Sequence, residues 1–179
     1  IWCFFFARNF KDLYNSMNIF QGCVSMICDF INPKAIIFEL DGTDRDDVLA
    51  ELTEKLITLK PNLKRDVVFK ALVEREEKKS SLVCKNLAVP HAVLPDITES
   101  VVALGLSHKG IEFDMSNSDI ETNTAKVVFA VIFPENKPDE HLQILKDILV
   151  LEKEADFMNK VLRAENSSEI CDIINKSRV

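Results

Sequence analysis

The chain has 179 residues, of which 47% are hydrophobic and 28% are charged, and its formal net charge is -7. This length fits one domain, and the apolar fraction is enough for a sizeable core. The acidic balance argues against nucleic acid or an anionic membrane as the main partner. The five cysteines are odd in number and show no CxxC spacing, so we expect free thiols in a reducing, cytoplasmic compartment and no metal site.

Residues 1–25 differ in pattern from the rest of the chain. The apolar run over 1–7 is too short to span a bilayer, and no basic region precedes it as a secretory signal requires. We therefore expect 1–25 to be an N-terminal extension outside the native fold, with the biological start at Met26 or, as second choice, Met17. A membrane-docking or dimerising tail is the alternative. No stable membrane insertion is expected.

The elements predicted in chain order alternate between strand and helix. A strand is expected over 35–40, followed by a helix that a capping box of Thr43 and Asp46 opens and Pro61 ends. The apolar stripe of this helix consists of Val48, Leu49, Leu52, Leu56 and Leu59. Strands follow near 87–90, 101–106, 111–113 and 126–133, and helices near 140–151, 155–164 and 167–175. A polar loop over 114–124 separates the last two strands.

A second helix, predicted over 65–79, carries a cation in an unusual place. Arg75 lies on the same helical stripe as Val68, Ala71 and Leu72, because these residues follow the spacing of one helix face. The guanidinium is therefore aligned with residues that face the core. By contrast His108, beside Lys109 and Gly110, is expected in a turn.

This order of elements predicts one α/β domain over residues 26–179, with a mixed β-sheet of about five strands flanked by helices on both faces. The strand ends then form the natural rim for a ligand. The chain has only four glycines and no glycine-rich phosphate loop, so nucleotide binding of the Walker or Rossmann kind is not expected. No cofactor is indicated.

The most informative motif is an apolar run over 87–89 that Pro90 stops and His91 follows. Proline neither donates to a sheet ladder nor leads into a helix, so we expect His91 at the end of a strand, where side chains meet solvent and ligands. Imidazole is largely neutral, and therefore nucleophilic, near physiological pH. Taken alone, such a histidine is more often a hydrogen-bonded surface residue.

The surroundings of this motif resemble a known family. An Arg75-Glu76 helix end leads through Ser80-Ser81 to the strand before His91, and a second histidine opens a helix that reads His-Leu-x-x-Leu. This order is similar to that of the enzyme IIA domain of the fructose/mannitol type, from the bacterial sugar phosphotransferase system and its nitrogen-regulatory branch. The resemblance covers roughly residues 26–176.

The resemblance implies a phosphohistidine carrier. The histidine-containing phosphocarrier protein would phosphorylate His91, and the group would pass to a IIB domain or a regulatory target, or serve as a signal. Such a carrier needs a neutral nitrogen in line with phosphorus, donors for the phosphoryl oxygens and no strong general base. His141 would support His91, Arg75 would neutralise phosphoryl charge or tether the loop, and Ser81 would do a similar, weaker job.

Other interpretations of these residues remain. Without the family likeness, His141 is a solvated histidine in a helix's first turn, and Arg75 belongs to a charged helix end. Three departures from the family pattern favour a regulatory or diverged member. Segment 78–86 lacks glycine, so a positive φ there would be strained. In addition, Val93 replaces a usual cation, and the loop over 114–124 is longer than is typical of the family. The alternative function is a non-catalytic regulatory protein-binding module of the same fold.

Overall fold

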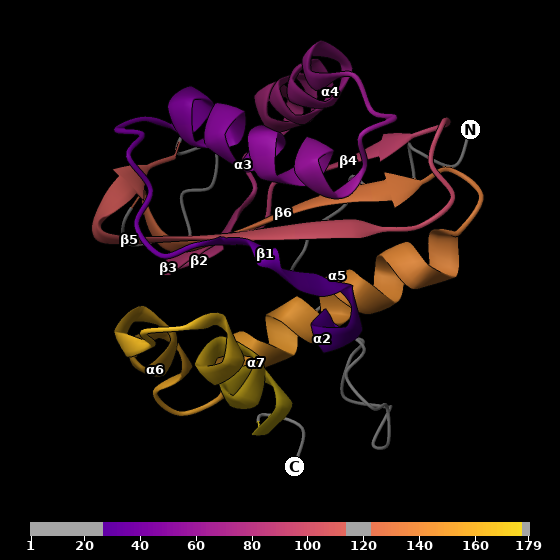
Figure 1. Cartoon of the computed structure of the whole chain (residues 1–179). Helices are drawn as coiled ribbons and strands as arrows, with labels where there is room; N and C mark the ends of the chain where they lie inside the picture. The colour runs from indigo at the N-terminus through magenta and orange to yellow at the C-terminus, as the bar shows by residue number, and fades with distance from the viewer. Residues whose placement is uncertain (1–26, 114–122, 177–179) are drawn as a thin grey trace.

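The computed structural model describes residues 27–113 and 123–176 (Figure 1). The expected extension over 1–25 and nearly all of the expected loop over 114–124 lie outside this part of the chain. Helices cover both faces of a mixed β-sheet, which confirms the predicted α/β class. The sheet has six strands in place of about five.

β6 is the central strand of the sheet. The strands are β1 (Ile31–Ile37), β2 (Leu82–Cys84), β3 (Asn86–Ala88), β4 (His91–Leu94), β5 (Val101–Glu112) and β6 (Thr124–Pro134). Their order is β1-β5-β6-β3-β2, and β4 also pairs with β6. β5 runs antiparallel to β6 and parallel to β1, whereas β3 and β4 both run parallel to β6. β6 therefore links the two halves of the sheet.

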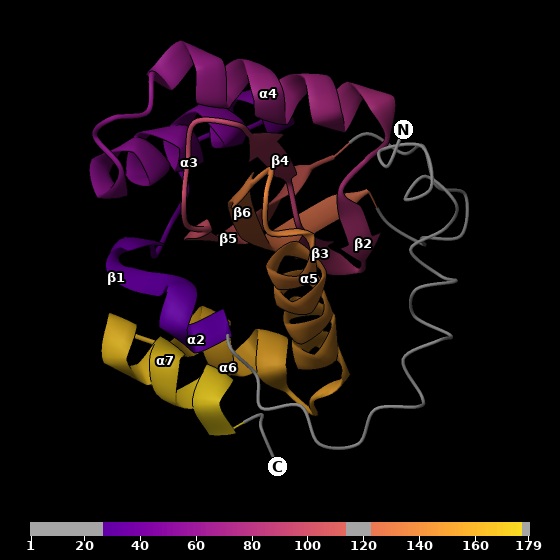
Figure 2. The same ribbon diagram turned by 90° about the vertical axis from the view of Figure 1, so that its right-hand side faces the viewer.

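Six helices form the two outer layers in the described part of the chain. They are α2 (Ile27–Phe30), α3 (Arg45–Leu59), α4 (Arg65–Lys78), α5 (Pro138–Lys153), α6 (Phe157–Arg163) and α7 (Ser167–Lys176). α3 and α4 lie on one face, and α2, α5, α6 and α7 lie on the other (Figures 1 and 2). None of these helices is long and apolar enough to cross a membrane.

The strands supply a separate hydrophobic core to each face. Side chains alternate along a strand, so Ala103 and Ala130 pack in the cluster beneath α3 and α4. Their neighbours Leu104 and Phe129 pack in the cluster with α5, α6 and α7. Both faces are buried over 101–106 of β5 and 127–133 of β6, and these stretches are almost continuously apolar.

β3 and β4 are two parts of one line of pairing along β6. Ala88 pairs with Val128 and His91 with Val131, with two residues between the pairs on each strand. Pro90 lacks an N–H, but its carbonyl accepts a hydrogen bond from Val131 N at 2.9 Å, so the pairing resumes at once. His91 thus begins a strand and is 7% exposed. As expected, His91 lies at an end of a strand, but the expectation that its side chain meets solvent there is wrong.

The glycine-poor segment before His91 contains a strand that the sequence did not predict. β2 and β3 form a short antiparallel hairpin, and Asn86 takes the left-handed conformation at φ 71°. Asparagine tolerates this conformation better than most residues. The structure describes every residue of 78–86, and of these residues only Asn86 has a positive φ. The missing glycine therefore costs this hairpin little.

Two other strands and one expected turn differ from the prediction. β1 begins at Ile31 and includes Pro33, which a bulged edge strand accommodates. β5 is one strand where two were expected, because Gly110, at φ 83°, forms an irregularity within it and not a turn. His108 accordingly lies in β5, where its Nδ1 bonds the Glu39 carboxylate and its Nε2 bonds Leu162 O. The turn predicted for His108 is wrong.

The capping residue of α3 also differs by one position from the prediction. The helix begins at Arg45, and the Asp44 carboxylate accepts a hydrogen bond from Asp47 N at 3.0 Å. Thr43, predicted as the cap, lies one residue outside. Both residues are exposed, so substitution changes the cap without opening a cavity.

We predict that Asp44→Ala lowers the free energy of unfolding by about 1 kcal/mol, because the amide of Asp47 loses its acceptor. Thr43→Ala should change it by less than about 0.5 kcal/mol. Urea unfolding of both variants measures the difference. An equal loss in the two would show that Asp44 does not cap the helix.

Candidate functional site

His91 is held in one orientation by a backbone carbonyl. Its Nδ1 lies 2.8 Å from Val89 O. A carbonyl oxygen only accepts, so Nδ1 carries the proton in this contact and donates it. In the neutral ring, Nε2 then has the free electron pair. The contact with Val89 thus leaves Nε2 as the ring nitrogen that is able to act as a nucleophile.

The environment of His91 keeps the ring neutral. Burial and, to a smaller extent, the positive charge of Arg75 together lower the pKa of His91 to about 3, although the bond to Val89 opposes the shift. A protonated imidazole has no free electron pair and cannot act as a nucleophile. The depressed pKa therefore keeps the ring in its reactive form at neutral pH.

His141 lies beside His91, in the first turns of α5. The two ring centroids are 5.6 Å apart, at an interplanar angle of 62°. Phe133 of β6 stacks on His141 with centroids 3.9 Å apart, and it meets His91 edge-on at 6.2 Å. Burial and the charge of Arg75 lower the pKa of His141 to about 4. His141 is thus half-buried and oriented by an aromatic ring that no motif in the sequence indicated.

The start of α5 is fixed by a contact with Ser100, the residue before β5. Glu140 accepts hydrogen bonds from the hydroxyl of Ser100 at 2.5 Å and from Lys137 Nζ at 3.2 Å. Burial by itself would raise the pKa of Glu140, but these bonds outweigh it and leave the pKa lowered. The anchored carboxylate holds the first turn of the helix, which begins at Pro138 and carries His141 as the next residue after Glu140.

Arg75 and Ser81 join the histidines from α4 and from the segment after it. The Arg75 guanidinium donates to Lys79 O at 2.9 Å, and its charge acts on both imidazoles. Ser81 O accepts from Val89 N at 2.9 Å, and the buried Ser81 hydroxyl has no hydrogen bond among the described residues. The fold therefore brings Arg75, His91 and His141 together, and it links the backbone of Ser81 to Val89, two residues before His91.

Glu76 was missed by the sequence interpretation. It stands in the charged run at the end of α4, yet it is 3% exposed, and its carboxylate accepts a hydrogen bond from Ser81 N at 2.8 Å. A helical spacing of four from the buried Leu72 places it on the core-facing stripe. That spacing was the signal that could have found it.

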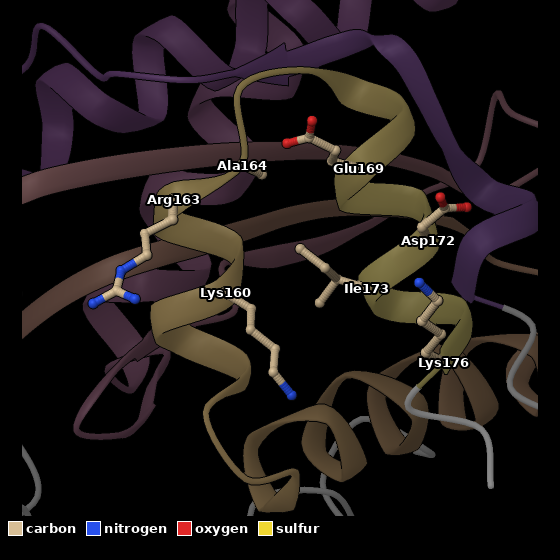
Figure 3. A pocket seen from close by; sticks show the side chains of 7 residues that line it. All are labelled: Lys160, Arg163, Ala164, Glu169, Asp172, Ile173 and Lys176. Carbon is tan, nitrogen blue, oxygen red and sulfur yellow. The ribbon is translucent and has the colours of Figure 1, made fainter.

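A hollow lies away from the histidines, between α6 and α7 (Figure 3). Its charged lining residues are of both signs: Lys160, Arg163, Glu169, Asp172 and Lys176. Mixed charges give this open groove no preference for an anion or a cation. Within 27–113 and 123–176, no group of three or more His, Cys, Asp or Glu side chains is placed to hold a metal ion.

Comparison with known proteins identifies the family. Residues 29–177 match the family model described as "Phosphoenolpyruvate-dependent sugar phosphotransferase system, EIIA 2". The chain belongs to this family, whose members are components of a phosphoryl-transfer system. The resemblance drawn from the motifs is therefore confirmed.

Two relatives show the range of the sequence likeness. The fructose-specific EIIA component of Haloferax volcanii is 30% identical over 110 residues, 62% of this chain and 69% of that protein. The fructose-specific EIIABC component of Bacillus subtilis is 23% identical over 150 residues, 84% of this chain. This chain spans only 23% of the EIIABC protein.

Solved structures show the same fold. Nitrogen regulatory protein IIA-Ntr from Neisseria meningitidis superposes with a TM-score of 0.75 at 19% identity, over 84% of this chain and 99% of that one. Enzyme IIAMtl of Escherichia coli, in a complex with phosphorylated enzyme IIBMtl, gives a TM-score of 0.66 at 14% identity, over 82% of this chain and 97% of that one. Both comparisons support the single-domain architecture.

The three histidines should titrate differently. We predict that His91 and His141 stay neutral from about pH 8 to about pH 5, whereas His108 titrates above about pH 6.5. The cause is burial near Arg75 for the first two, and for His108 the Glu39 carboxylate, which raises its pKa. NMR of the ring protons against pH measures all three. A His91 midpoint near the ordinary value would contradict the buried, neutral site.

Proposed function

We propose that His91 accepts a phosphoryl group on Nε2 from the histidine-containing phosphocarrier protein, and that the chain is a phosphohistidine carrier of the phosphotransferase system. The observation that carries this proposal is the bond from Nδ1 to Val89 O in a buried ring. It leaves one defined nitrogen as the nucleophile. Family membership supports the same reaction.

The transfer step follows from this geometry. The electron pair of Nε2 forms the new N–P bond while the N–P bond of the donor phosphohistidine breaks, and the donor nitrogen keeps that electron pair. The His91 ring gains positive charge as the bond forms. The proton on Nδ1 stays in place, and its hydrogen bond to Val89 O strengthens because the donor becomes cationic. The carbonyl thus stabilises the transition state more than the ground state.

The neighbouring residues take supporting roles in the proposal. The fixed charge of Arg75, which acts on both histidines, offsets the negative charge that arrives with the phosphoryl group. The neutral His141 ring beside His91 can donate a hydrogen bond to a phosphoryl oxygen. The unpartnered Ser81 hydroxyl supplies a further donor from the adjoining segment.

The next acceptor in the proposal is a IIB domain or a regulatory target protein. The solved complex of a structurally similar IIA protein with a phosphorylated IIB protein supports the first, and nitrogen regulatory proteins among the relatives support the second. Val93, two residues from His91 and 42% exposed, stands where the family usually has a cation. This loss of charge favours a regulatory or diverged member. We infer that the protein acts in the cytoplasm, where the phosphoryl relay operates.

We predict that incubation with phosphoenolpyruvate, enzyme I and the phosphocarrier protein labels His91 with an acid-labile, base-stable phosphate. His91→Ala should abolish the label, whereas His108→Gln should keep it, because His108 lies on β5 with both nitrogens engaged. Mass spectrometry of the labelled protein locates the group. Full labelling of His91→Ala would move the acceptor elsewhere, and no labelling of the wild type would favour the non-catalytic binding module.

We further predict that His141→Ala and Arg75→Ala slow phosphorylation of His91 by about tenfold or more, because each removes a group that stabilises transferred charge. The modified residue should stay His91. Arg163→Ala is the matched control for loss of a guanidinium, since Arg163 is exposed on α6. A quenched phosphotransfer assay measures the rates. Wild-type rates in both His141→Ala and Arg75→Ala would show that neither residue supports the transfer.

A further inference from the structure

Glu76 is a buried carboxylate that the transfer step described above does not use. It is 3% exposed, and its Oε1 accepts from Ser81 N at 2.8 Å. Its Oε2 is buried without a hydrogen-bond partner among the described residues. A buried carboxylate that is only partly hydrogen-bonded costs stability. An apolar residue would avoid that cost but would leave the buried Ser81 N without its acceptor, so the contribution of this carboxylate is the hydrogen bond to Ser81.

A chain of three hydrogen bonds connects Glu76 to the proposed acceptor. Glu76 holds Ser81 N, Ser81 O accepts from Val89 N at 2.9 Å, and Val89 O accepts from His91 Nδ1 at 2.8 Å. Every link is within ordinary hydrogen-bond distance. Each link also fixes a group that makes the next one, so displacement of Ser81 is transmitted to the carbonyl that faces His91.

Glu76 acts on the same turn as Arg75. The Arg75 guanidinium bonds Lys79 O at 2.9 Å, and the Glu76 carboxylate bonds Ser81 N two residues further on. Arg75 thus binds a backbone carbonyl of the turn, and Glu76 binds a backbone N–H of the same turn. Together they fix the path of the backbone from the end of α4 to β2.

We propose that Glu76 is a positioning residue for phosphoryl transfer: through Ser81 and Val89 its carboxylate keeps the proton of His91 on Nδ1 and leaves Nε2 as the nucleophile. The effect of Glu76 on the rate of phosphoryl transfer rests on the proposed function, but its effect on the tautomer of His91 does not. The role needs an acceptor atom at the position of Oε1. It does not need the negative charge.

The test compares substitutions at Glu76 that separate the acceptor from the charge. Glu76→Gln keeps an acceptor oxygen but loses the charge, and Glu76→Leu keeps the approximate volume but loses the acceptor. Glu76→Asp keeps the charge, but its side chain is shorter by one methylene, so the carboxylate lies further from Ser81 N. Glu77→Leu is the matched control, because Glu77 is the next residue of α4 and is exposed. The ¹⁵N shifts of the His91 ring give the tautomer, and phosphotransfer gives the rate.

We expect Glu76→Gln and Glu77→Leu to keep the Nδ1-protonated ring and a rate within about twofold of the wild type. Glu76→Leu and Glu76→Asp should show a mixture of tautomers and a rate lower by about tenfold or more. If Glu76→Leu does not fold, Glu76→Asp carries the same comparison. Wild-type tautomer in the folded variants that lack the acceptor overturns the proposal, as does a Glu76→Gln variant that behaves like Glu76→Leu.

The two readouts separate this proposal from the proposed function. If the wild type takes no phosphate at His91, the proposed function fails, yet the ring shifts still test whether Glu76 selects the tautomer. If His91 is phosphorylated in every Glu76 variant at the wild-type rate, the carrier function stands and the positioning role fails.

Discussion

The hydrogen bond between His91 Nδ1 and Val89 O is the interaction on which the site depends. It requires the chain to turn through Pro90 while both flanking strands stay paired to β6. In an uninterrupted strand, the side chain of residue 91 would point to one face of the sheet by simple alternation. The carbonyl of residue 89 would then not accept a hydrogen bond from it. The sheet, the proline and the histidine therefore form one unit, which the layers of helices bury from both faces.

Neutral histidines at such a site reduce stability in acid. The pKa values of His91 and His141 in the folded protein, about 3 and about 4, lie below the ordinary value of about 6.5. Above about pH 6.5 the two histidines make their full contribution to the free energy of unfolding. This contribution is lost as the pH falls toward the folded-state pKa values, because the unfolded chain then binds protons that the folded chain does not. The same burial and the same charge of Arg75 keep Nε2 of the candidate acceptor unprotonated, so the neutral state of the ring and the acid sensitivity have one cause.

Particular elements show where prediction from the sequence succeeded and failed. The helices α3 and α4 were found because their apolar residues recur at the spacing of a helix face. β2 was missed because a three-residue strand carries too little periodicity to distinguish it from a loop, and β5 was divided because Gly110 gives the signal of a turn whether it ends a strand or only distorts it. Glu76 was given no role, because a run of charged residues hides the carboxylate that is buried against the core.

The sequence by itself determined the α/β class, the family and the identity of the candidate acceptor, since periodicity and a proline–histidine pair are local properties of the chain. Only the tertiary structure decided which nitrogen of His91 is free, how His141 is oriented and which carboxylate is buried. These depend on Val89 O, on the ring of Phe133 and on the packing of α4, none of which is visible in a linear pattern. Burial and hydrogen-bond direction arise from contacts between distant segments, and these set the chemistry of the site.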